Sequence, residues 1–146
     1  MDYKFAEEKI KNIISKSSNI LDDVVVFLYE NFDHYSWVGI YLVEGNNLVL
    51  VSWKGLHATE HTIIPIGQGI CGAAAASGKT EVIPDVKADN RYLSCFMSTK
   101  SEIVVPIKKD GKIIGEIDID SDIKNAFSKD DTIFLEKIVD MLSEHI

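Results

Sequence analysis

Two cysteines are the residues of this sequence best suited to covalent chemistry. Cys95 lies in RYLSCFMSTKSEIVVPI, a polar loop that runs into a strand, and Cys71 follows the glycine-rich stretch GQGI. Such a pair supports redox chemistry, in which one thiolate attacks an oxidised substrate, becomes a sulfenic acid and condenses with the other thiol. The helix start predicted after GQGI would favour the thiolate of Cys71 as the more acidic one, and position alone leaves the attacking thiol open.

A row of carboxylates is the second unusual feature. In GEIDIDS, Glu116, Asp118 and Asp120 alternate with isoleucines, so on a strand these acids share one face. Charged residues are usually exposed, which makes a solvated face the ordinary interpretation. However, Glu102 opens the neighbouring strand, and crowded carboxylates raise one another's pKa until one can act as an acid. The face could also bind a free amino group, whereas Glu116 is assigned no role.

Two other interpretations of the cysteines compete with redox chemistry. His57, His61, Cys71 and Cys95 could supply four zinc ligands, but structural zinc sites pair ligands two to four residues apart, unlike these cysteines. Inert packing suits Cys71, between glycine and alanine, better than Cys95, which has polar neighbours. Redox chemistry alone uses both thiols and the carboxylates.

Composition narrows the class of protein. The 146 residues suggest one domain with a core of its own, and 46% hydrophobic residues argue against disorder. A net charge of −8 makes nucleic acid an improbable partner. The charged N-terminus lacks the apolar core of a signal peptide, and no apolar run reaches the roughly 18 residues of a membrane span. We therefore expect a cytoplasmic protein with reduced thiols and no membrane partner.

The hydrophobic pattern predicts an antiparallel α+β domain, because helices and strands come in separate blocks. Strands are expected at 37–43, 48–53, up to Pro65, 80–86, 102–107 and 112–120, with Asp110-Gly111 as a hairpin turn. Helices are expected over 5–14, after an N-cap at Ser18 or Asn19, within 67–79, and after an N-cap at Ser128 with Asp131 completing a capping box. The spacing places Phe5, Ile10, Ile13 and Ile14 roughly on one face of the first helix, and the buried stripe of the last helix consists of Ile133, Phe134, Ile138 and Leu142.

At this point the sequence resembles a known family. It is similar to GAF domains, and more specifically to the free methionine-(R)-sulfoxide reductases, from about Trp37 to the last helix. The resemblance rests on WVGIYLV, IPIGQGICGAAAASGK, the spacing of Cys71 and Cys95, a cysteine seven residues before the glutamate of SEIVVPI, and IIGEIDIDS. It implies a single GAF domain over residues 1–146. The sheet would have six antiparallel strands, with the terminal helices on one face and ligand-enclosing loops on the other.

The resemblance also implies roles for individual residues. Cys95 takes the position of the attacking cysteine and Cys71 that of the resolving one. The substrate-site positions are three carboxylates and two aromatics: Glu102, Asp118, Asp120, Trp37 and Tyr41. Two positions depart from the family pattern, because His61 replaces a third cysteine and Phe96 replaces an aspartate after the attacking cysteine.

The implied activity is reduction of free L-methionine (R)-S-oxide. Glu102 and Asp120 would bind and protonate the sulfoxide oxygen, and Asp118 would anchor the amine. Thioredoxin or a similar dithiol would reduce the resulting disulfide, and no metal or organic cofactor is needed. Analogy with GAF domains adds a homodimer formed through the terminal helices. The alternative is a non-catalytic GAF sensor that binds a small polar ligand.

Overall fold

An antiparallel sheet organises the structure, a computed structural model that describes residues 1–93, 96 and 98–146. Within these residues the sheet has six strands in the order β3-β2-β1-β6-β5-β4, so the predicted α+β fold is confirmed. The strands are β1 (Trp37–Glu44), β2 (Asn47–Gly55), β3 (Ile63–Pro65), β4 (Glu81–Ile83), β5 (Ser101–Lys109) and β6 (Lys112–Ser121). The helices are α1 (Tyr3–Lys16), α2 (Ile20–Asn31), α3 (Gly69–Ser77) and α4 (Lys129–Ser143), with a short 3₁₀ turn at Val86–Ala88.

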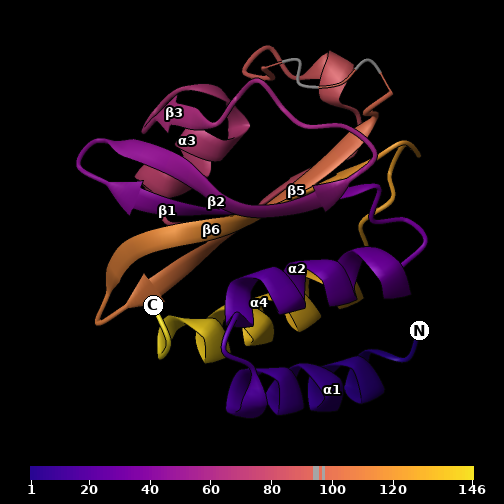
Figure 1. Cartoon of the computed structure of the whole chain (residues 1–146). Helices are drawn as coiled ribbons and strands as arrows, with labels where there is room; N and C mark the ends of the chain where they lie inside the picture. The colour runs from indigo at the N-terminus through magenta and orange to yellow at the C-terminus, as the bar shows by residue number, and fades with distance from the viewer. Residues whose placement is uncertain (94–95, 97) are drawn as a thin grey trace.

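The two faces of the sheet are covered differently (Figure 1). Helices α2 and α4 pack against one face, and α1 lies beneath them as an outer layer. Helix α3 packs on β5 and β6 from the opposite side, near β3 and the connecting loops. The terminal helices therefore share one face, as the family resemblance implies, and the other face is left to α3 and the loops. No helix in the described part of the chain is long and apolar enough to cross a membrane.

Strict alternation along the central strands separates a hydrophobic core from a polar face. Ile40 of β1, Ile103 of β5 and Ile117 of β6 are fully buried against the terminal helices. Their neighbours in sequence point to the side of α3, because successive strand residues point to opposite faces. Burial of large apolar side chains on the helix side fixes the register, since a slip of one residue would exchange the two faces.

The predicted hairpin turn forms as expected, and a glycine also ends helix α3. Asp110 and Gly111 adopt positive φ angles of 54° and 76° between β5 and β6, which suits the twist of a tight hairpin. Gly78 ends α3 in the left-handed conformation with φ 71°, and its N–H donates to the carbonyl of Ala74. The β5–β6 hairpin matters for function because it carries all of the acids predicted for the site.

The predicted buried stripe of the last helix is partly wrong, and the apolar face predicted for the first helix is only partly covered. Phe5 of α1 is 53% exposed and Ile133 of α4 is 45% exposed, whereas Ile10 and Phe134 are buried. Helix α1 packs mainly on α2 and α4, and its buried residues are Ala6 and Ile10. Periodicity identifies the apolar side of a helix, but the partner surface decides how wide a stripe is covered.

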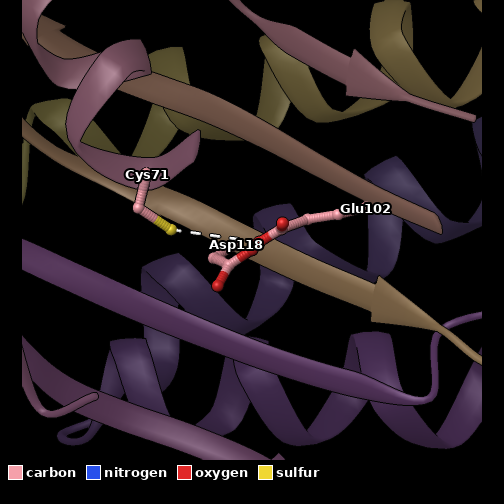
Figure 2. Close-up of side chains that lie close together, drawn as sticks. All are labelled: Cys71, Glu102 and Asp118. Atoms are coloured by element: carbon pink, nitrogen blue, oxygen red, sulfur yellow. Dashed lines mark hydrogen bonds between the residues drawn. The ribbon is translucent and has the colours of Figure 1, made fainter. Parts of the chain in front are cut away.

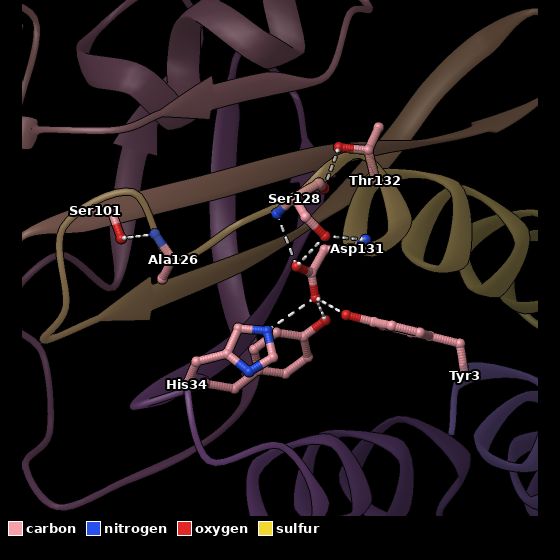
Figure 3. A network of polar contacts seen from close by, with 8 residues as sticks. Tyr3, His34, Ser101, Ala126, Ser128, Asp131 and Thr132 are labelled. Atoms are coloured by element: carbon pink, nitrogen blue, oxygen red, sulfur yellow. Dashed lines mark hydrogen bonds and ion pairs between the residues drawn. The ribbon is translucent and has the colours of Figure 1, made fainter. Parts of the chain in front are cut away.

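A buried aspartate ties the first and last helices to the start of the sheet (Figure 3). Oδ1 of Asp131 accepts hydrogen bonds from the hydroxyls of Tyr3 (3.0 Å) and Tyr35 (2.7 Å) and lies 2.9 Å from Nε2 of His34. Its other oxygen accepts the N–H of Ser128, which completes the predicted capping box of α4. These contacts join segments about 100 residues apart and hold the helical layer together.

Candidate active site

Four acids line the polar face of the sheet, all of them buried. Glu116, Asp118 and Asp120 of β6 are 0%, 3% and 3% exposed, and Glu102 of β5 is 5% exposed. Glu102 and Asp120 are directly paired across β5 and β6. The ordinary interpretation of this row as a solvated surface is therefore wrong, and Glu116, given no role from the sequence, is the most deeply buried of the four. Its alternation with Asp118 already indicated its face.

The predicted aromatics lie on the same face of the sheet. In β1, Trp37 pairs with Asp120 and Tyr41 pairs with Glu116, and both aromatic side chains are buried. The Trp37 indole also lies against β2, where a Cβ atom on Gly55 would come within 2.4 Å of its Cδ1 atom. Glycine at this position gives the ring room to lie flat on the sheet. Trp53, which sequence reasoning missed, stacks on Trp37 with ring centroids 6.3 Å apart.

Helix α3 brings Cys71 over the carboxylates (Figure 2). The thiol Sγ lies 3.9 Å from Oε2 of Glu102 and points toward the two strands that carry Glu102 and Asp118. A close approach of backbones makes this possible, since a Cβ atom on Gly72 would lie 2.7 Å from the carbonyl oxygen of Pro65. The glycine-rich segment GQGICG therefore positions a thiol within contact distance of the buried acids.

The environment of Cys71 corrects the expectation of an acidic thiol. Burial raises the pKa of Cys71 well above its usual value, and the nearby carboxylates, Asp118 and Glu116 foremost, raise it further. Loss of water and negative neighbours both disfavour a thiolate, and here they outweigh the helix start. Cys71 is therefore held as a neutral thiol at rest, which suits a residue that reacts second.

The buried environment favours the neutral, protonated forms of the acids themselves. Burial raises the pKa of Glu116 and of Asp120, in each case reinforced by the charge of Asp118, and burial also raises the pKa of Asp118. Both oxygens of Glu116 and the Oδ1 atoms of Asp118 and Asp120 have no hydrogen-bond partner among the described residues. Buried polar atoms normally have partners, so these oxygens are available to a ligand.

Two cavities open beside this row of acids. A cavity of about 250 Å³ lies between Trp37, Phe96, His57 and Asp120. A much smaller one, about 20 Å³, is lined by Tyr41, Cys71, Glu102 and Asp118 together with apolar side chains. The larger space has room for a small amino acid with an aromatic wall and a carboxyl group, and the smaller one for a single water or ion.

The predicted site residues are thus gathered together, with one exception. The smaller cavity is lined by Cys71, Glu102, Asp118 and Tyr41, and the larger one by Trp37 and Asp120. The predicted attacking residue, Cys95, lies outside the described residues. The histidine zinc set is not assembled in the described part of the chain, where the close group of potential metal ligands is Cys71, Glu102 and Asp118, without His57 or His61.

Comparison with known proteins adds a family and several relatives. The GAF domain model matches residues 18–146. The free methionine-R-sulfoxide reductase of Escherichia coli is 35% identical over 124 residues, which are 85% of this chain and 74% of that protein. The free methionine-R-sulfoxide reductase of Neisseria meningitidis, solved with its substrate, superimposes with a TM-score of 0.91 at 34% identity, covering 97% of this chain and 86% of that one. The reduced fRMsr of Staphylococcus aureus gives a TM-score of 0.90 at 38% identity, covering 98% and 94%.

Proposed function

The chain belongs to the GAF domain family, and we propose that it is a free methionine-(R)-sulfoxide reductase. The observation that carries the proposal is the row of buried acids beside the thiol of Cys71, with Sγ 3.9 Å from Glu102. A sulfoxide oxygen needs a proton donor, and the amine of a free amino acid needs an anion. A crowded carboxyl face supplies both. We also propose that residues 1–146 form a single GAF domain, since α1, which precedes the family match, packs on α2 and α4.

In the first half-reaction, the thiolate of Cys95 attacks the sulfoxide sulfur. The carboxyl pair of Asp120 and Glu102, which lie opposite each other across the strands, binds the oxygen and donates one proton to it. Burial and the charge of Asp118 raise the pKa of Asp120, so this carboxyl holds a transferable proton near neutral pH. The S–O bond of the substrate breaks, methionine leaves, and the protonated oxygen is transferred to the sulfur of Cys95 as a sulfenic acid, so that this sulfur is oxidised as the substrate is reduced.

Substrate orientation follows from the remaining groups on the face. Asp118 anchors the ammonium group, because its Oδ1 is buried without a partner among the described residues. Trp37 and Tyr41 supply the apolar wall for the S-methyl end, since sulfur packs favourably on aromatic rings. The indole N–H of Trp37 is likewise buried without a described partner, so it is a donor for an oxygen of the substrate.

In the second half-reaction, Cys71 resolves the sulfenic acid. Its sulfur attacks the sulfur of Cys95, a disulfide forms and the hydroxyl leaves as water. The neutral thiol must lose a proton, and Glu102, 3.9 Å away, can accept it and pass it to the departing hydroxyl, which then leaves as water. Thioredoxin or a similar dithiol then reduces the disulfide by exchange. Because that chemistry needs reduced thiols, we propose that the protein works in the cytoplasm, and we also propose a homodimer through the terminal helices.

The test is a thioredoxin-coupled assay of NADPH consumption with each diastereomer of free methionine sulfoxide. We expect turnover of the R form alone by the wild type and none by Cys95→Ser. Replacing thioredoxin by a small dithiol separates a failure of the reductant from a failure of the enzyme. A folded, reduced protein that turns over neither form with either reductant would overturn the proposal and favour a GAF sensor of small polar ligands.

A further inference from the structure

We propose that the small cavity between Cys71, Glu102 and Asp118 binds a single Zn²⁺ ion in the reduced protein, and that this ion inhibits the enzyme. The binding goes beyond the proposed function, and only the inhibition depends on it. The ion is not a cofactor of the reaction. It would occupy the groups that transfer protons and resolve the sulfenic acid (Figure 2).

The geometry of the three side chains fits a metal ion. One sulfur and two carboxylate oxygens, one from each residue, all lie within 4.8 Å of one another. The Sγ of Cys71 and Oε2 of Glu102 are 3.9 Å apart. Tetrahedral zinc with Zn–S of about 2.3 Å and Zn–O of about 2.1 Å places such a pair about 3.6 Å apart. The Sγ and Oε2 atoms therefore need to move only a few tenths of an ångström closer to bind the same zinc ion.

The space between these ligands also has the right size. Its volume is about 20 Å³, and about 10–15 Å³ is enough for one water molecule. Ile64, Ile70 and Leu93 form apolar parts of its wall. Such a cavity admits a single ion between its three ligands. The low polarity of the wall strengthens the attraction between a cation and its ligands.

Buried carboxyl oxygens without hydrogen-bond partners give the site its preference for a cation. Oδ1 of Asp118, Oδ1 of Asp120 and both oxygens of Glu116 are buried without hydrogen-bond partners among the described residues. Buried acids left without partners are costly, and a divalent ion removes that cost while leaving the fold as it is. A thiolate in the ligand set selects zinc over magnesium and calcium, which prefer oxygen ligands in larger numbers.

Binding would block the reaction at two points. The ion displaces the proton of Cys71 and holds its sulfur, so Cys71 cannot attack the sulfenic acid. It also takes an oxygen of Glu102, which then neither donates a proton to the sulfoxide nor accepts one from the thiol. Because the ligands must be deprotonated, zinc should bind more tightly as the pH rises.

The test is a titration of the reduced protein without substrate or thioredoxin. Zn²⁺ is titrated in competition with a chromophoric chelator, and Co²⁺ serves as a spectroscopic probe. We expect one equivalent of Zn²⁺ and a thiolate-to-cobalt charge-transfer band. Cys71→Ser should lose the band, and Glu102→Gln, which keeps the shape of the side chain, should bind Zn²⁺ at least tenfold more weakly. Thermal melting of each variant in the presence of a chelator verifies that it is folded.

Two control variants separate this site from the other possible ligand set. Cys95→Ser and His57→Ala should both bind Zn²⁺ as the wild type does. Absence of stoichiometric binding, or binding that persists in Cys71→Ser, would overturn the proposal, as would loss of binding in either control. Methionine released in a single turnover, measured without thioredoxin, should fall with the fraction of zinc-bound protein. A protein that binds zinc at Cys71 but reduces no sulfoxide would refute the proposed function and leave the site standing.

Discussion

The indole ring of Trp37 covers Gly39, its second neighbour along β1, so closely that a Cβ atom on Gly39 would lie 2.3 Å from the indole Cη2 atom. Gly39 is also paired with Asp118 of the neighbouring strand β6. The absence of a side chain at Gly39 thus lets the aromatic wall of the larger cavity lie next to the acid proposed to hold the amine. This relationship makes a glycine without any reactive group part of the substrate site.

We predict that Gly39→Ala displaces the Trp37 ring and weakens catalysis. The added methyl group should lower kcat/KM at least tenfold, because a misplaced ring disturbs substrate orientation, and should destabilise the fold by about 1–3 kcal/mol through overpacking. Steady-state kinetics and thermal melting measure the two effects. Adding Trp37→Leu should restore stability without restoring kcat/KM. Unchanged kinetics in a folded Gly39→Ala variant would show that the ring does not contact the substrate.

Substitutions of the acids should show which of them donate protons and which of them bind the substrate. Glu102→Gln keeps the shape but removes the proton, so we expect kcat to fall by about 10²–10⁴-fold. Asp118→Asn should instead raise KM with a smaller change in kcat, because it removes an interaction with the amine that persists through the reaction. Steady-state kinetics with the R diastereomer distinguishes the two. Equal effects of both variants on kcat and KM would contradict the assignment of roles.

Glu116 should destabilise the folded protein. Burial raises its pKa, so the unfolded chain releases a proton that the folded chain retains, and stability is lost as the pH rises above the ordinary range of a glutamate. We therefore expect Glu116→Leu to stabilise the fold by about 1–3 kcal/mol near neutral pH, with a gain that increases with pH. Denaturant unfolding between acidic and alkaline pH, with a chelator present, measures it. Glu44→Leu, at the exposed end of β1, is the control and should show no such increase.

Asp131 should have the opposite pH dependence. Burial alone would raise the pKa of Asp131, but the hydrogen bonds from His34, Ser128 and Tyr35 lower this pKa to about 2. A lowered pKa contributes stability that is present above the ordinary value of 3.8 and is lost as the pH falls toward 2. Asp131→Asn should thus lose about 2 kcal/mol at neutral pH, with a deficit that shrinks in acid.

Acid titration followed by circular dichroism, together with denaturant unfolding, tests this prediction. Asp130→Asn is the matched control, since Asp130 lies in the same first turn of α4 but is exposed. A deficit of equal size in both variants, or one that persists at pH 2, would mean that the charge of Asp131 does not stabilise the fold.

Local patterns in the sequence predicted much of this structure. The Asp110-Gly111 turn, the capping box of Ser128 and the shared face of Asp118 and Asp120 each depend on neighbours within a few residues. The same hairpin predicted that Glu102 lies near the acids of β6, and the structure shows that it pairs with Asp120. These features are set by backbone geometry and side-chain alternation, which the sequence displays directly.

Features that depend on distant packing were missed. The exposure of Phe5 and Ile133 reflects which helices pack against one another. The raised pKa of Cys71 reflects its burial between α3 and the sheet, which outweighs the effect of the helix start. The contact between Asp131 and Tyr3 joins residues 128 positions apart. The Trp37 ring packs closely on Gly39 of β1 and Gly55 of β2, and this contact likewise depends on the register of the two strands.

The most direct test of the account is a single turnover without any reductant. Fully reduced protein is mixed with free methionine (R)-sulfoxide, and methionine and free thiols are counted. The wild type should form one methionine per chain and lose both thiols, because Cys71 closes a disulfide with Cys95. Cys71→Ser should form the same methionine, lose one thiol and leave a trappable sulfenic acid. Methionine formed by Cys95→Ser, or wild-type thiols that remain unchanged, would contradict the assignment of Cys95 and Cys71.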